Sequence, residues 1–323
     1  MGCRHSSSSP NSPKKVVKNS NPIALKKKIF LSHSQRLHHP KSNGWKTSSF
    51  LKTFNLEQIL DGQEENLVKR LEFTSTCLLY DVSSTHILLF DNNQLHLIDM
   101  NTTNTKSILV SMDIQEIVWS THLNRFLVLT TNQLYQTELD QMQLKPVQQI
   151  QFIQEGQRKS FMAVNGTDLI INRSFGSNIC RYSLKTYEFL QSLCVYKGQK
   201  NICVTTIRLN SNKILALAIS IQAKQMIDLV QLSTEQILHR IQLDANENLS
   251  YPVDLHLHGY WFAKTSIPNV DIGHCLITPD GQILRLLLFS HQDNFIRSLR
   301  INSERKWLVV GRQYALELYS LQH

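Results

Sequence analysis

Short apolar runs alternate with polar turns along the chain from about residue 66 onward. The runs contain many β-branched side chains, and no long 3.6-residue periodicity accompanies them. Such runs, separated by turn-forming residues, are typical of β-strands rather than of amphipathic helices. The pattern therefore predicts an all-β domain over residues 66–323.

One apolar segment recurs six times within this region. The copies, which include L-H-L-I-D-M and L-E-L-Y-S-L, start at Leu95, Leu134, Ile179, Ile227, Ile272 and Leu316. Their starts lie 39, 45, 48, 45 and 44 residues apart. A period of about 40–45 residues is typical of propeller blades, because each blade is one unit that needs its neighbours to bury its apolar faces.

Further apolar runs surround the repeated segment. A polar turn and another run follow it at Phe189–Leu193, Ile237–Ile241 and Ile283–Phe289. A pair of runs precedes it at Ile117–Trp119 with Phe126–Leu129, at Val204–Leu209 with Ile214–Ile219, and at Ile296–Ile301 with Trp307–Val310. Each unit therefore contains four strands, as a blade requires.

These units resemble the blades of WD-repeat and related propellers over roughly residues 66–323. The resemblance is one of pattern, because the Trp-Asp mark of WD repeats is absent and Ile98-Asp99 is its nearest counterpart. It implies a divergent WD-repeat-like β-propeller with six blades, and seven blades is the alternative count.

The two ends of the region predict how the ring closes. The last copy, Leu316–Leu321, stops two residues before the C-terminus, so the sixth blade lacks its outer strand. An apolar run at Leu67–Phe73 precedes the first blade and has no place in it. Pairing these two strands removes two exposed sheet edges, so we expect the N-terminal strand to close the ring.

The blades' paired inner strands also predict part of the core. Apolar side chains on these strands face the neighbouring blades, and burying them drives the packing of one blade on the next. The residues predicted to be buried are Trp119, Phe126, Leu215, Leu217, Trp307 and Val309.

The first 65 residues differ from the rest in composition. Residues 1–50 are rich in Ser, Pro, Asn, His and Lys, and they contain too few apolar residues to offset the entropy of ordering, which predicts a disordered tail. Asn55 and Gln58 have the spacing of a capping box, and Asp61-Gly62 would end a helix. Residues 51–65 are therefore predicted to form a short helical linker.

The basic charge of the chain belongs to this tail. The formal net charge is +9, and residues 1–56 hold eleven Lys and Arg but no Asp or Glu. Subtracting these eleven from the chain's 34 leaves 23 basic against 25 acidic residues, a net of −2 for the remainder. The composition therefore excludes a strongly basic groove on the folded body and favours a polybasic tail.

The N-terminus carries a lipidation motif. Met1-Gly2-Cys3-Arg4-His5-Ser6 matches M-G-x-x-x-[ST], in which Gly2 is myristoylated after Met removal, and Cys3 is a candidate for palmitoylation. One myristoyl chain binds membranes only marginally, at roughly 10⁴ M⁻¹, so a second signal is needed. The alternative is a chance match in a low-complexity tail.

Two further sets of tail residues belong to the membrane hypothesis. The candidate contacts to an anionic membrane surface are Lys14, Lys15, Lys18, Lys26, Lys27 and Lys28. Ser9-Pro10 and Ser12-Pro13 are candidate phosphorylation sites, where each phosphate adds about −1.5 to −2 charges and would weaken such contacts. A nuclear-localisation patch and a merely solvated tail are the other interpretations of the lysines.

No motif indicates an enzyme, a cofactor or a metal site. Glycine is scarce, at 11 residues, and neither a phosphate-binding loop nor G-x-S-x-G occurs. Asp254, His256 and His258 alternate along one predicted strand and His274 lies nearby, but the spacing places no further acidic or cysteine ligand. We therefore expect no catalytic, cofactor-binding or metal-binding residues.

The sequence favours a protein-binding scaffold or adaptor that offers a propeller face to a protein or peptide. Six cysteines without a C-x-x-C pair, and no secretory segment, fit a reducing compartment and predict a cytoplasmic protein, tethered to a membrane if the tail is acylated. The alternatives are a propeller hydrolase or lyase with a histidine-based site, and a nuclear or nucleic-acid-associated propeller. The charge of the body disfavours nucleic acid, and the sequence does not decide whether a small molecule binds.

Overall fold

The structure is a computed structural model that describes most of the chain from residue 67 onward. The described ranges are 67–73, 79–102, 104–152, 159–173, 178–199, 201–222, 224–242, 248–254, 261–266, 272–289, 298–302, 307–312 and 314–320. The predicted tail over 1–50 and the predicted linker over 51–65 lie outside these ranges and stay predictions.

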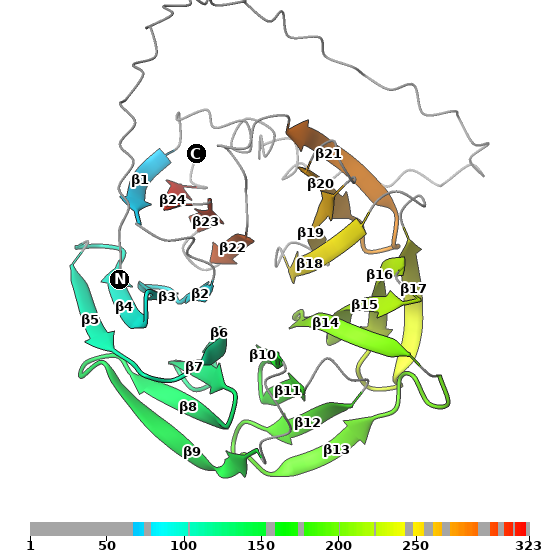
Figure 1. Ribbon diagram of the computed structural model, residues 1–323, viewed down its shortest axis with the longest axis horizontal. Coiled ribbons are helices and arrows are strands. Elements are labelled where there is room, and N and C mark those ends of the chain that lie inside the picture. The colour runs from blue at the N-terminus through cyan, green and yellow to red at the C-terminus, as the bar shows by residue number, and fades with distance from the viewer. Residues whose placement is uncertain are drawn as a thin grey trace, which may run out of the picture. The chain divides into compact units, whose positions relative to one another are not determined.

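Strands in the described ranges form six four-stranded antiparallel sheets, and five of these sheets use four consecutive strands (Figure 1). The first contains β2 (Leu79–Val82), β3 (His86–Asp91), β4 (Gln94–Asp99) and β5 (Thr105–Leu109). The second contains β6 (Ile114–Ser120), β7 (Arg125–Thr130), β8 (Gln133–Glu138) and β9 (Gln143–Gln151). The third contains β10 (Phe161–Asn165), β11 (Asp168–Asn172), β12 (Ile179–Ser183) and β13 (Phe189–Leu193).

The remaining sheets complete the set. The fourth contains β14 (Ile202–Leu209), β15 (Ile214–Ile221), β16 (Lys224–Gln231) and β17 (Gln236–Gln242). The fifth contains β18 (Asn248–Asp254), β19 (Trp261–Ser266), β20 (Ile272–Ile277) and β21 (Ile283–Phe289). The sixth joins the two ends of the described chain, because β1 (Leu67–Glu72) pairs with β24 (Ala315–Ser320), which continues to β23 (Trp307–Gly311) and β22 (Ser298–Asn302).

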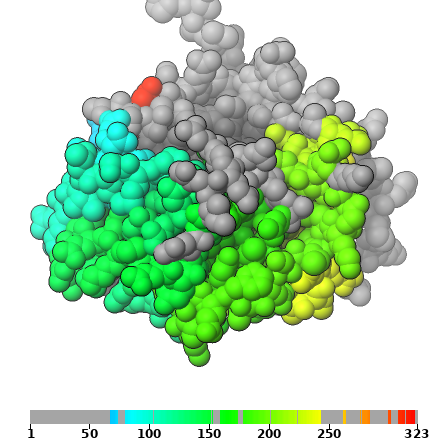
Figure 2. All heavy atoms as spheres, turned by 60° about the horizontal axis from the view of Figure 1, so that its bottom comes forward, coloured from blue at the N-terminus to red at the C-terminus, as the bar shows by residue number. Residues whose placement is uncertain are grey.

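The sheets are arranged around a central axis with one strand of each innermost (Figure 1). Inner strands contact each other in the order β2, β6, β10, β14, β18, β22 and back to β2. Neighbouring sheets, coloured from cyan to yellow-green in chain order, lie side by side in Figure 2. This arrangement confirms the predicted all-β propeller fold.

The predicted pairing of the terminal strands is present. β1 runs antiparallel to β24, with Leu71 opposite Leu316 and Arg70 opposite Glu317. The guanidinium of Arg70 also forms an ion pair with Glu317 at 3.2 Å. The pairing covers the edge of β24 that would otherwise be exposed to solvent.

All six copies of the repeated segment lie in the third strand of their sheets, namely β4, β8, β12, β16, β20 and β24. In four of the sheets, the turn after the third strand contains one residue with a positive φ. These residues are Met142, Tyr187, Glu235 and Gly281. At Gly281, where φ is +80°, an added Cβ would lie 2.6 Å from Cγ of His239 in the preceding blade. A glycine there serves both the turn and the close contact between blades.

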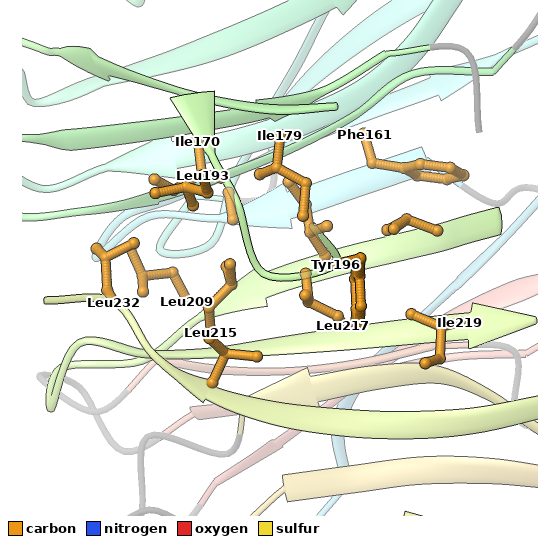
Figure 3. Packing of buried hydrophobic residues seen from close by; sticks show 14 of the residues in the cluster. Phe161, Ile170, Ile179, Leu193, Tyr196, Leu209, Leu215, Leu217, Ile219 and Leu232 are labelled. Atoms are coloured by element: carbon orange, nitrogen blue, oxygen red, sulfur yellow. The ribbon is translucent and has the colours of Figure 1, made fainter. Parts of the chain in front are cut away.

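Apolar clusters between the sheets form the core. One cluster lies between the third and fourth sheets, where Tyr196 packs among Ile170, Ile179, Leu215 and Leu217 (Figure 3). The tyrosine lies in the connection between the two sheets, so it joins both sides of the cluster. The burial of such clusters between blades stabilises the ring against opening.

The core prediction was right for four of its six residues. Phe126, Leu215, Leu217 and Val309 are fully buried. The two tryptophans were predicted wrongly, because Trp119 and Trp307 are only partly buried at the edges of their clusters. Trp119 lies against a cavity among the inner strands, and a residue as large as tryptophan is rarely buried completely.

No helix long and apolar enough to cross a membrane occurs in the described part of the chain.

Candidate functional site

A cavity of about 140 Å³ lies at one mouth of the central channel. Its walls come from the inner strands β2, β6, β10, β14 and β22 and from the turns after β6 and β10. Among the described residues, its charged lining consists of Asp81, Arg208 and Arg300, and Trp119 also lines it. Residues separated by more than 200 positions in the chain therefore meet in one site.

The strands place these charges by alternation. On β14 the neighbours of Arg208, Ile207 and Leu209, are both buried. On β2 the residues on either side of Asp81 are likewise buried. Successive side chains point to opposite faces of a strand, so each charged side chain lies opposite the face that its neighbours bury.

Arg300 and Asp81 form the first ion pair of the site. Arg300 Nε lies 3.2 Å from Asp81 Oδ1, and the second carboxylate oxygen accepts a hydrogen bond of 2.6 Å from the backbone N–H of Trp119. The guanidinium also lies 5.7 Å from the ring centroid of Tyr80. This pair ties β22, β2 and β6 together at the channel mouth.

Arg208 and Glu116 form the second pair. Both terminal nitrogens of Arg208 donate to Glu116, each at 3.3 Å, and one of them also donates to the backbone oxygen of Ile207 at 2.7 Å. The pair joins β14 to β6 past the intervening β10. The two parallel bonds make this a bidentate pair, which fixes the orientation of the guanidinium.

The two arginines influence one another. Burial lowers the pKa of the Arg208 guanidinium from its ordinary value of 12.5, Glu116 opposes this, and the nearby positive charge of Arg300 adds to the lowering. Arginine stays protonated in proteins, so the site contains two cations close together.

Both guanidinium groups of the cluster reach the cavity. Their charges are matched by Asp81 and Glu116, and of the two carboxylates only that of Asp81 belongs to the described lining. The hydroxyl oxygen of Ser120 already accepts a hydrogen bond from the N–H of Leu123 at 3.2 Å. The charged side chains of the cavity can bind a ligand by ion pairs and hydrogen bonds.

Other buried ion pairs serve the packing of the blades. Asp228 on β16 is fully buried, accepts two hydrogen bonds of 2.8 Å from Arg240 on β17, and accepts one of 2.9 Å from the hydroxyl of Tyr196. Burial, reinforced by the Asp228 charge, raises the pKa of Tyr196, which keeps its hydroxyl protonated and donating. None of these three residues lines the channel cavity.

The sequence-predicted site residues lie mostly elsewhere. Those of the tail, from Gly2 to Lys28, lie outside the described residues, as do His256 and His258. Asp254 ends β18 and His274 lies in β20. Within the described ranges, no three His, Cys, Asp or Glu side chains lie close enough together to hold a metal ion.

Reasoning from the sequence missed the channel cluster, although a signal for it exists. Arg208 and Arg300 each follow an apolar residue and precede another, in I-R-L and L-R-I, on strands predicted to be innermost. A charge inside an apolar inner strand must be paired or face the channel. That criterion would have selected both arginines, but their partners cannot be identified by spacing.

Comparisons with known proteins support the fold. No protein-family model matches the chain, and no curated protein matches it in sequence. A solved structure of hydrazine synthase from Kuenenia stuttgartiensis is similar, with 9% identity, 75% of each chain covered and a TM-score of 0.56. A chain from a crystal structure of the mitotic checkpoint complex is also similar, with 10% identity, 80% of this chain and 96% of that chain covered, and a TM-score of 0.55. At such identities the similarity shows the fold alone.

Proposed function

We propose that this protein is a protein-binding scaffold, built as a divergent WD-repeat-like propeller whose six sheets form one closed ring. The observation that carries the proposal is the channel-mouth cavity, to which five inner strands contribute. A site assembled from five blades keeps its shape only while the ring is closed, so the ring presents a preorganised surface to a partner. Preorganisation lowers the entropy cost of binding.

The chemistry of the cavity supports binding rather than catalysis. Its charged groups are paired with one another, as in Arg300 with Asp81 and Arg208 with Glu116. Paired guanidinium and carboxylate groups fix geometry and select partners by charge. The similar chain in the mitotic checkpoint complex is part of a protein assembly, and this supports the same role for the propeller here.

We further propose that the tail brings the scaffold to the cytoplasmic face of a membrane. Gly2 and Cys3 would carry acyl chains, and the tail lysines would contact anionic lipids, each contributing about 1 kcal/mol. Phosphorylation of Ser9 and Ser12 would then release the protein by offsetting part of the basic charge.

Fractionation of cells tests the tether. Wild type, Gly2→Ala, Cys3→Ser and the Ser9→Glu/Ser12→Glu double variant are compared, with acylation followed by a clickable myristate analogue. We expect wild type on membranes and the three variants largely in the soluble fraction. If Gly2→Ala fractionates like wild type, the hypothesis of an acyl tether is wrong. Accumulation of wild type in nuclei would favour the nuclear alternative.

Affinity capture from cells tests the scaffold itself. The tagged full chain is compared with Arg300→Gln, which alters the cavity, and with Arg181→Gln, whose partner Asp168 keeps a second cation in Lys213. We expect at least one protein to be captured by wild type and by Arg181→Gln but lost from Arg300→Gln. Capture of no protein above the tag-only background would contradict a scaffold.

A further inference from the structure

The channel cavity has a charge pattern that points to a particular ligand. Its lining carries the carboxylate of Asp81 against the guanidinium groups of Arg208 and Arg300. The side chains of the two arginines are 17% and 14% exposed, so they are largely removed from water while still reaching the cavity. A partly desolvated guanidinium that still has donors to offer attracts an anion more strongly than a surface lysine does.

The arginines can bind such an anion while they keep their ion pairs between the inner strands. Arg300 uses Nε for Asp81 and one terminal nitrogen for the backbone oxygen of Leu299, at 3.1 Å. Arg208 binds Glu116 through both terminal nitrogens, at 3.3 Å each, which leaves its Nε for another acceptor. A guanidinium presents five donors in a planar fork, which matches the two oxygens of a carboxylate.

The size of the cavity limits what can enter. Its 140 Å³ is well above the roughly 10–15 Å³ that one water molecule requires, so a side-chain-sized group fits. Trp119, Val118 and Val164 are among the residues that line the cavity. A short aliphatic stem that ends in one carboxylate fits this volume and can reach the guanidinium donors.

We propose that the cavity binds one carboxylate of a partner peptide, supplied by an acidic side chain or by a C-terminus. This inference rests on the proposed scaffold function and specifies the chemistry of its partner. The carboxylate lies between Arg208 and Arg300 and accepts hydrogen bonds from guanidinium donors that Asp81 and Glu116 do not use. Specificity then comes from the rest of the peptide at the channel mouth.

Nuclear magnetic resonance of the arginine side-chain Nε–Hε groups in the full chain tests the proposal. N-acetylglutamate amide represents an acidic side chain, N-acetylglycine represents a chain end, N-acetylglutamine amide is the uncharged control, and inorganic phosphate is the competing anion. We expect saturable shifts of the Arg208 and Arg300 signals with one or both carboxylates, at dissociation constants on the order of millimolar. The glutamine compound should cause no such shifts.

Two variants with opposite effects separate binding from folding. Asp81→Asn removes the negative charge from the lining and should tighten carboxylate binding several-fold, whereas Arg300→Gln should weaken it about tenfold or more. Arg181→Gln, outside the cavity, should bind like wild type. Partial unfolding cannot raise the affinity for the carboxylate. Tighter binding by Asp81→Asn would therefore support the site even if Arg300→Gln folds poorly.

Some outcomes would overturn the inference. Absence of saturable shifts with both carboxylates, phosphate binding in preference to them, or weaker binding by Asp81→Asn would each do so. Equal capture of proteins by wild type and Arg300→Gln would support the scaffold function and contradict a carboxylate site at Arg300. Binding of the carboxylates without capture of any protein would support a small-anion site and contradict the scaffold function.

Discussion

The buried carboxylate of Asp228 offers a quantitative test of how the blades are held together. It is fully buried, while the side chain of its partner Arg240 is 38% exposed. Removing the arginine by Arg240→Gln leaves a buried negative charge with only the Tyr196 hydroxyl as a strong partner. Breaking a buried pair in this way costs about 3–5 kcal/mol.

The reverse substitution should cost less. Asp228→Asn leaves Arg240 unpaired, but this guanidinium can turn toward water because more than a third of it is already exposed. We therefore expect a loss of about 1–3 kcal/mol, typical of a broken hydrogen-bond network that is partly rehydrated. Tyr196→Phe removes one hydrogen bond and should cost about 0.5–1.5 kcal/mol.

Urea denaturation of the three variants, followed by tryptophan fluorescence and by circular dichroism, measures these free energies of unfolding. The expected order of destabilisation is Arg240→Gln, then Asp228→Asn, then Tyr196→Phe. Coincident transitions by the two probes are required for the free energies to be comparable. The expected order depends on Asp228 being more buried than Arg240. It would be refuted if Arg240→Gln lost the same or less free energy of unfolding than Asp228→Asn.

Three further predictions concern core, turn and pH. Leu217→Ala, at a fully buried position, should cost about 2–5 kcal/mol, whereas Leu109→Ala, at a side chain that is 79% exposed, should change stability by less than about 0.5 kcal/mol in the same urea assay. Gly281→Ala should lower Tm more than Gly198→Ala, because both have positive φ but only Gly281 also meets an imidazole at 2.6 Å; equal losses by calorimetry would disprove this. Burial, together with a hydrogen bond to a glutamate, raises the pKa of Tyr319 to about 12. The unfolded chain therefore releases this proton near pH 10 while the folded chain keeps it, so stability should fall between about pH 10 and 12, and less steeply in Tyr319→Phe.

Much of the architecture was predictable because it is local. The repeated segment, its flanking runs and the turn chemistry all depend on residues within one blade, and every copy indeed lies in a third strand. Even the long-range pairing of β1 with β24 could be predicted, because an incomplete last blade and an unassigned first strand each leave an open sheet edge.

The site was not predictable to the same extent. Ion pairs such as Arg208 with Glu116 join strands that are 92 residues apart, and no spacing rule links them. They meet because closure of the ring brings the inner strands around one channel. Partial burial of Trp119 was missed for a related reason, since the cavity that exposes it exists only in the closed ring.

Photo-crosslinking at the channel mouth tests the central claim most directly. A benzoyl-phenylalanine introduced at Thr121, which is exposed and lines the cavity, is compared in cells with one at Leu109 on an outer strand. We predict a discrete crosslinked protein from position 121 that disappears in the Arg300→Gln background, persists in the Arg181→Gln background and is absent from position 109. No crosslink at position 121, or one that does not depend on Arg300, would contradict a scaffold that binds through this cavity.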